Sequence, residues 1–77
     1  MEITIDQSLD ARGMNCPLPI LKTKKLLGGM RSGQILEVIA TDPGSVKDMD
    51  SFCQQTGNKL VAVEENSGTF HFNIRKS

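Results

Sequence analysis

Aromatic residues are scarce in this chain of 77 residues, which has no tryptophan, no tyrosine and only three phenylalanines. Proteins that hold single-stranded nucleic acid commonly stack its bases on exposed aromatic side chains. The formal net charge is zero, so the whole molecule has no positive field that would attract a polyanion. We therefore expect no direct binding of nucleic acid.

Cysteine and histidine are nearly absent as well, since Cys16, Cys53 and His71 are the only residues of these types. Two widely separated cysteines are too few for a disulfide scaffold, and they lack the clustered spacing of a structural zinc site. The sequence therefore predicts no metal and no other cofactor. There is also no Cys-x-x-Cys pair, which argues against a dithiol redox protein.

Long apolar runs are missing too, and none approaches the ~20 residues that a transmembrane helix needs. The first six residues have neither the basic nor the apolar segment of a signal peptide. We therefore expect a cytoplasmic protein without membrane association. With 38% apolar and 23% charged residues, the chain suits one domain over 1–77, near the lower size limit for a self-sufficient core.

The first half of the chain has the periodicities of a strand, a helix and a second strand. Apolar and polar residues alternate over 3–9, which predicts a half-buried strand. Residues 17–28 predict a helix that ends at a glycine pair. Its expected core stripe consists of Pro19, Ile20, Thr23, Leu26, Leu27 and Met30. The nearly continuous apolar run over 35–40 predicts a central strand.

The second half predicts a helix and a terminal hairpin. Asp42 as the N-cap and Pro43 at the first position begin the helix, and Gly57 ends it. Strands over 59–64 and 70–75 follow, joined by a turn. The order is therefore β-α-β-α-β-β, which predicts an α/β (α+β) two-layer sandwich with two helices on one face of a mixed four-stranded sheet.

The segment Cys16-Pro17-Leu18-Pro19 places a thiol where the first helix begins. A helix N-terminus favours an anion, and a thiol reacts as its thiolate. Pro17 is expected at the first helical position and Pro19 within the first turn, where neither costs a helical hydrogen bond. The prolines would stiffen this turn and leave chiefly the N–H groups of Cys16 and Leu18 as free donors near the sulfur.

These residues, with the loop Leu9-Asp10-Ala11-Arg12-Gly13 before them, form a pattern. It continues through Gly33-Gln34, Asp42-Pro43, Phe52-Cys53 and Gly57 to a closing hairpin. The pattern resembles the TusA/SirA-like family of small sulfur-carrier proteins. The resemblance implies the same sandwich fold and a sulfur carried on Cys16 as a persulfide.

The resemblance also implies partners and supporting residues. The sulfur would come from a cysteine desulfurase or another sulfur donor protein and pass to an acceptor protein of a relay. Such relays serve tRNA thiolation, molybdenum-cofactor assembly or other sulfur metabolism. The supporting residues would be Asp10, Arg12 and Gly13 in the loop, with Pro17 and Pro19 as rigid flanks. The chain would then be a sulfurtransferase-type carrier rather than a free-standing enzyme, and a monomer suits such a shuttle.

The helix surface beside Cys16 suggests where partners would dock. Leu18 and Leu21 fall outside the core stripe, on the same side as Lys22 and Lys25. Exposed leucines are common on protein surfaces, but next to a reactive turn we expect these four residues to form a docking surface. Leu18 stands where family members of the tRNA-thiolation pathway often have a polar or acidic residue, which counts against that pathway.

Two alternatives to a sulfur carrier remain open at this stage. The first is a regulatory or RNA-binding α/β module without sulfur chemistry, which would use the basic cluster at 22–25. The second is a redox switch in which Cys53 resolves Cys16, although Cys53 lies within an apolar stripe and is expected to behave as a small hydrophobe. His71 is expected on a sheet face or the surface, away from this chemistry.

The loop residues around Cys16 leave their own alternatives. Asp42 is either a plain helix cap or a neighbour of Cys16, because the carboxyl ends of parallel strands gather at one edge of a sheet. Arg12 pairs with Asp10 or Asp42, or contacts a partner protein. The sequence does not decide between these arrangements.

Overall fold

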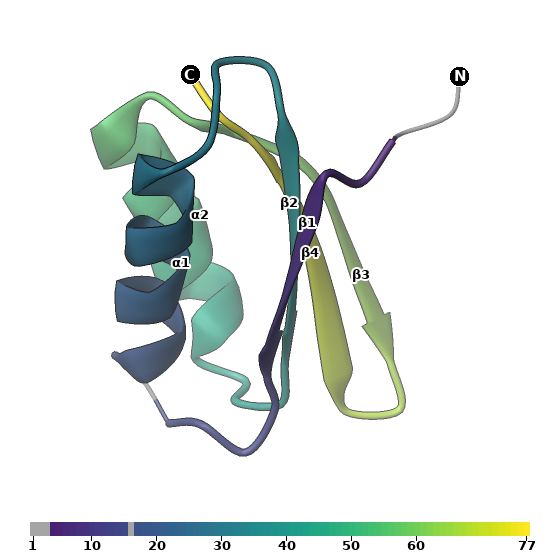
Figure 1. The fold of residues 1–77 in the computed structure, drawn as a ribbon. Helices are drawn as coiled ribbons and strands as arrows, with labels where there is room; N and C mark the ends of the chain where they lie inside the picture. The colour runs from purple at the N-terminus through teal and green to yellow at the C-terminus, as the bar shows by residue number, and fades with distance from the viewer. Residues whose placement is uncertain (1–3, 16) are drawn as a thin grey trace.

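The computed structural model describes residues 4–15 and 17–77. Its elements follow the predicted order β-α-β-α-β-β (Figure 1). They are β1 (Gln7–Ala11), α1 (Leu18–Gly28), β2 (Ile35–Ala40), α2 (Ser45–Thr56), β3 (Lys59–Asn66) and β4 (Thr69–Arg75). Neither helix in these ranges combines the length and the apolarity that crossing a bilayer would take.

The four strands form one sheet in the order β1-β2-β4-β3. β1 runs parallel to β2, while β4 is antiparallel to both β2 and β3. Both helices lie against the same face of this sheet (Figure 1). The predicted two-layer sandwich with a mixed sheet is thereby confirmed.

The core lies between the helices and the sheet and follows the alternation of the central strands. In β2 the buried side chains are Leu36, Val38 and Ala40, which stand opposite Ile74, Phe72 and Phe70 of β4. Phe52 of α2 is buried as well, so all three phenylalanines belong to the core. Burying one side chain of this size contributes about 1.5–3 kcal/mol.

The predicted core stripe of α1 is confirmed. Pro19, Thr23 and Leu27 are buried, and Ile20 and Leu26 pack against the core at its margin. The buried Thr23 hydroxyl donates to the Pro19 carbonyl oxygen at 2.7 Å, so its polar group keeps a partner inside the protein.

The first strand begins later than predicted. β1 starts at Gln7, Ile5 precedes it with its side chain exposed, and Ile3 lies outside the described residues. The last backbone hydrogen bond between the two strands runs from the Asp6 N–H to the Ile35 carbonyl at 2.9 Å, and the Ile35 N–H donates to the Asp6 carboxylate at 2.7 Å. A side chain thus replaces the next backbone bond of the strand pair.

The second helix also begins later than predicted, at Ser45, with Gly44 as its N-cap. The Asp42 carboxylate accepts the Gly44 N–H at 3.1 Å, and the Asp42 carbonyl accepts the Ser45 hydroxyl at 2.6 Å. Asp42 therefore closes a turn that precedes the helix instead of capping it, because an aspartate can bond the backbone two residues on. Gly57, at φ +79°, ends α2 as predicted.

β3 is the outer strand next to β4, and its pairing contains an irregularity. The register shifts between Leu60 and Ala62, so Val61 is an extra residue without a partner opposite it. Val61 and the nearby Val63 are both exposed on this outer strand.

Candidate functional site

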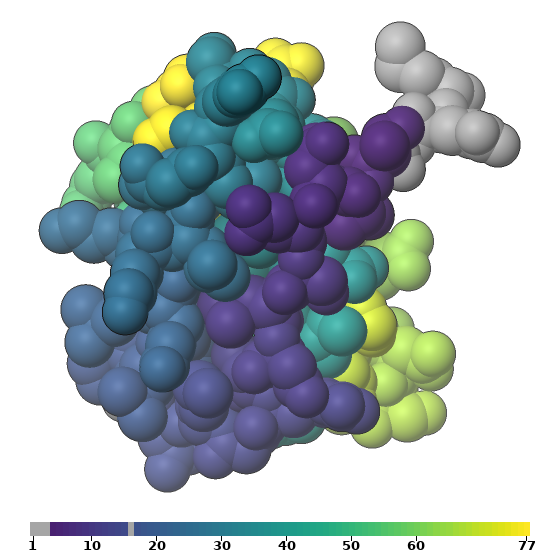
Figure 2. Space-filling model, in the orientation of Figure 1, coloured from purple at the N-terminus to yellow at the C-terminus, as the bar shows by residue number. Residues whose placement is uncertain are grey.

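The loop that carries Cys16 joins the carboxyl end of β1 to the start of α1 (Figure 1). Cys16 itself lies outside the described residues, but Asn15 and Pro17 on either side of it are exposed. Figure 2 shows the loop after β1 and the adjoining helix α1 on one continuous surface that faces the viewer. We therefore describe the site through the residues on either side of Cys16 and through those that hydrogen-bond to the loop.

Thr41, at the end of β2, holds the middle of the loop. Its hydroxyl accepts the Gly13 N–H at 2.9 Å, and the Met14 N–H donates to the Ala11 carbonyl at 3.2 Å. Gly13 has φ +79°, a conformation that glycine adopts without strain. The partner of Gly13 lies far along the chain, and sequence reasoning missed Thr41.

Asp10 and Arg12 form a two-pronged ion pair before the loop. Arg12 donates from Nε to Oδ1 at 2.9 Å and from Nη2 to Oδ2 at 3.0 Å, and its backbone N–H reaches Oδ1 at 3.1 Å. These hydrogen bonds lower the pKa of Asp10 to about 2. Of the alternatives for Arg12, the structure therefore selects Asp10. Because the pair is solvent-exposed, it contributes little to stability, and its main effect is to hold the conformation of the turn.

The first turn of α1 differs from the predicted one by a residue. Pro17 occupies the N-cap, so Leu18 and Pro19 are the first two helical positions. The Leu18 N–H donates to the Asn15 carbonyl at 2.9 Å, and the Pro17 carbonyl accepts the Leu21 N–H at 3.0 Å. The prediction that the Leu18 N–H is free was therefore wrong, because the loop's own carbonyl satisfies it.

The charge around this helix start is favourable to an anion. α1 has no acidic residue in its first turn, and the helix dipole at an exposed site stabilises a negative charge by about 0.3–1 kcal/mol. Leu18 and Leu21 are 48% and 56% exposed, and Lys22 and Lys25 are exposed beside them. We call these four residues the outer stripe of α1, since their spacing places them on the face opposite the core.

A groove between α1 and α2 begins next to the loop. It has a volume of about 300 Å³ and is bounded by the N-cap residue Pro17, by Ile20 of α1 and by Asp48, Ser51, Phe52 and Gln55 of α2. Pro17 follows Cys16 in the chain, so the groove begins where the loop ends and runs toward α2. No pattern in the sequence predicts this groove, because it depends on how the two helices pack.

Asp42 lies half-buried in the loop after β2, at the same sheet edge as the end of β1. Its predicted role as a helix cap is wrong, as described above. The other alternative made Asp42 a neighbour of Cys16, and Cys16 lies outside the described residues. Within 4–15 and 17–77, no three His, Cys, Asp or Glu side chains gather in a way that would hold a metal ion.

Cys53 and His71 both lie on elements other than the loop that carries Cys16. Cys53 is 3% exposed in the core, and burial raises the pKa of its thiol to about 11, with a smaller effect from the negative charge of Asp50. It therefore stays protonated near neutral pH and behaves as a small hydrophobe, as predicted. His71 lies on β4 between two buried phenylalanines, so it projects from the sheet face that the helices do not cover.

Comparison with known proteins places this geometry in a family. The family model described as "Sulfurtransferase TusA" matches residues 7–76. The chain is 65% identical over 72 residues to the sulfur carrier protein TusA of Allochromatium vinosum, covering 94% of this chain and 95% of that relative. It is 40% identical over 75 residues to the sulfur carrier protein TusA of Pseudomonas putida, covering 97% and 94%.

A solved structure has the same fold. The crystal structure of the SirA-like protein from Desulfitobacterium hafniense superposes with a TM-score of 0.80 and covers 90% of this chain and 95% of its own. At 23% identity, that likeness concerns the fold alone. This neighbour confirms the predicted fold, and the family model together with the 65% identical relative confirms the predicted family resemblance.

Proposed function

We propose that this chain, which belongs to the TusA sulfurtransferase family and serves as a sulfur carrier in a relay, holds the sulfur as a persulfide on Cys16. The observation that carries the assignment is the 65% identity to a sulfur carrier over nearly the whole length of both chains. Cys16 is the proposed carrier because the other thiol, Cys53, is buried in the core.

The proposed transfer moves one sulfur atom without net oxidation. The Cys16 thiolate attacks the outer sulfur of a persulfide on the donor protein. The donor's sulfur–sulfur bond breaks, the donor cysteine leaves as a thiolate, and Cys16 becomes a persulfide anion. An acceptor nucleophile then attacks the outer sulfur of Cys16, whose own sulfur leaves as a thiolate.

The hydrogen bonds that hold the loop support this role, because they restrict the backbone on both sides of Cys16. Thr41 and the Asp10–Arg12 pair hold the loop before Cys16, and Pro17 restricts the backbone after it. The helix dipole contributes about 0.3–1 kcal/mol toward an anionic sulfur. That term is too small for fast transfer alone, so we propose that the partner's site supplies the remaining catalysis.

We propose that partners dock on the outer stripe of α1. Leu18 and Leu21 offer apolar contact, while Lys22 and Lys25 attract an acidic surface. The donor would be a cysteine desulfurase or another sulfur donor protein, and the acceptor a further relay protein that serves tRNA thiolation, molybdenum-cofactor assembly or other sulfur metabolism. We further propose that residues 1–77 act as one monomeric, cytoplasmic domain.

An RNA-binding function has less support. The three phenylalanines are all buried, and the chain contains no tryptophan or tyrosine to stack on a base. No second function is therefore proposed for this surface.

The decisive experiment measures the intact mass of the protein after incubation with a cysteine desulfurase and free cysteine. We expect a gain of one sulfur atom, about 32 Da, that a reducing agent removes. Cys16→Ser should remove the gain, whereas Cys53→Ser should keep it. Equal loading of the Cys16→Ser variant, or no gain with any of several donors, would contradict the proposal.

A further inference from the structure

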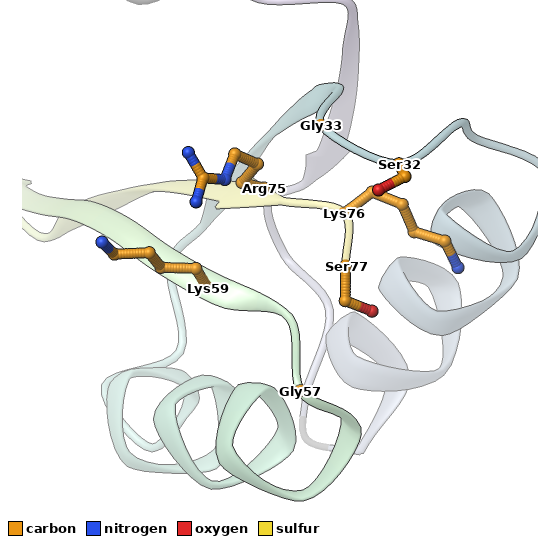
Figure 3. A pocket seen from close by; sticks show the side chains of 7 residues that line it. All are labelled: Ser32, Gly33, Gly57, Lys59, Arg75, Lys76 and Ser77. Carbon is orange, nitrogen blue, oxygen red and sulfur yellow. The ribbon is translucent and has the colours of Figure 1, made fainter.

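The two outer strands of the sheet differ in how regular their free edges are. β3 is interrupted by the bulge at Val61, and it begins at Lys59, whose charged end lies on the same face of the sheet as that of Arg75 (Figure 3). Bulges and charged side chains on an outer strand discourage the addition of another strand. β1 contains neither lysine nor proline, and it pairs with β2 from Gln7 to Ala11 without a shift of register. Of the two edges, β1 therefore offers the more regular template for a further strand.

The free edge of β1 is open to solvent. Gln7, Ser8 and Asp10 are exposed, and Figure 2 shows β1 on the surface that faces the viewer, with α1 beside it. In the described part of the chain, β2 is the only strand that pairs with β1. Every second backbone N–H and C=O of such an outer strand points away from the sheet, so β1 keeps a row of groups that a further strand can bond.

One flank of α1 lies above this edge. α1 packs against β1, β2 and α2, and its residues Ile20 and Lys24 line the hollows on the side of α2. Each residue advances about 100° around a helix, so Leu18 and Lys22 lie on the opposite flank, toward the free edge of β1. Both residues belong to the outer stripe of α1. The surface proposed above for docking therefore continues onto β1.

The charge on this flank favours an acidic strand. α1 contains no acidic residue, and neither Lys22 nor Lys25 forms a side-chain ion pair among the residues that the structure describes. On β1, Leu9 shares the helix-covered face with its buried neighbour on β2, while Ser8 and Asp10 lie on the uncovered face. Side chains of an added strand alternate between the same two faces. Acidic side chains at every second position would therefore all lie on the side of the lysines.

A second copy of this chain fits the edge poorly. Antiparallel pairing of two β1 strands relates the copies by a two-fold axis, so both α1 helices would lie on the same face of the joined sheet. Their flanks with Lys22 would then meet, and α1 has no carboxylate there to offset the charge. Like charges brought together at an interface oppose association. A different, acidic chain is therefore the better occupant.

We propose that the free edge of β1 binds an extended segment of a relay partner that carries acidic side chains at every second position. This binding rests on the proposed function, since the segment belongs to a sulfur donor or acceptor. β1 ends at Ala11 and the loop to Cys16 follows directly, so a segment paired with β1 ends beside that loop. Main-chain hydrogen bonds supply the affinity, and the flank with Lys22 supplies the selectivity.

The test attaches a peptide to Cys16 of the ¹⁵N-labelled full chain through a disulfide bond and measures amide hydrogen exchange. The peptide consists of a cysteine, two glycines and three Glu-Val repeats, so its glutamates share one face of a strand. In the protein without peptide, we expect alternate amides of Gln7–Ala11 to exchange fast. The attached peptide should slow this outward-pointing set about fivefold or more and leave the other set unchanged.

The matched variants are Lys22→Gln and Lys24→Gln, which change the same residue type on opposite flanks of α1. At low salt, Lys22→Gln should reduce the slowing about two- to fivefold, whereas Lys24→Gln should leave it as in the parent. A peptide with lysine in place of glutamate should protect β1 less. Equal protection by the two peptides, equal effects of the two variants, or protection without the two-residue alternation would overturn the proposal.

Three further outcomes separate this proposal from its alternatives. Protection of the same amides in the unmodified protein at rising concentration would overturn it in favour of a second copy. Sulfur loading of Cys16 with no protection of β1 by the peptide would overturn this inference alone. A Cys16 thiol that forms no disulfide with the peptide would contradict the proposed function, and the inference would fall with it.

Discussion

The two ends of the sheet differ in how their charges are used. At the end that holds the Cys16 loop, Arg12 is engaged by Asp10, and the loop is tied to the sheet through the side chain of Thr41. At the other end, Lys59 and Arg75 are cross-strand partners, and neither forms a side-chain ion pair within residues 4–15 and 17–77. The first arrangement uses an ion pair to order a loop, whereas the second leaves two positive charges on the surface of the sheet.

The largest expected effect comes from a substitution in the core, which destabilises both ends of the sheet together. Phe72 is completely buried at the centre of β4. Phe72→Ala should lower the free energy of unfolding by about 3–5 kcal/mol, which is a large share of the ~5–15 kcal/mol available to a typical domain. Chemical denaturation measures this change. Val61→Ala, at a partly exposed edge position, should cost far less, and an equal cost would show that the core is not where the structure places it.

The next effect separates the two thiols. Near neutral pH the Cys53 thiol is protonated, because burial raises its pKa to about 11. A thiol-alkylating reagent should therefore modify Cys16 in the native protein and both cysteines only after denaturation. Mass spectrometry of the native protein against time gives the measurement. Native alkylation of Cys53 at a rate similar to that of Cys16 would contradict the burial of Cys53.

A smaller effect concerns only the Cys16 end. Thr41→Val keeps the shape of the side chain but leaves the Gly13 N–H without its acceptor. We expect a loss of stability of about 0.5–1.5 kcal/mol and slower sulfur loading, because the loop is held less firmly. Loading kinetics with a desulfurase test this. Thr56→Val, which removes a hydroxyl at the end of α2, is the matched control and should leave loading rates unchanged.

The smallest effect is a dependence of stability on pH. Arg12 lowers the pKa of Asp10 from 3.8 to about 2 in the folded protein. The stabilisation from this pair is therefore present above the unfolded value and is lost as the pH falls toward 2. Asp10→Asn should flatten the acid side of the stability curve slightly, and added salt should shrink the difference. Thermal unfolding of both proteins between these pH values provides the comparison.

The elements that the sequence predicted well are those fixed by local pattern. β2 spans the predicted residues because its apolar run has no competing turn signal, and Gly57 ends α2 because no other residue adopts a positive φ as easily. Asp42 was misplaced because an aspartate before a proline and a glycine can either cap a helix or close a turn. The structure shows that the backbone used the second option.

The parts of the site that escaped prediction depend on tertiary contacts. Thr41 meets Gly13 only because β1 and β2 end together, and the sequence did not decide between Asp10 and Asp42 as the partner of Arg12. The pairing of Lys59 with Arg75 follows from the register of the hairpin, which a β-bulge shifts within β3. No pattern in the sequence reports that register before the strands are paired.

The extra residue in β3 has a consequence for how these molecules behave when crowded. An unpaired outer strand invites another chain to add to the sheet, which is the first step toward fibrous aggregates. The bulge at Val61 bends that strand and breaks the even spacing of its outward N–H and C=O groups. A strand of a neighbouring molecule can therefore form few regular hydrogen bonds with this edge. The irregularity thus helps a small carrier to stay soluble at high concentration.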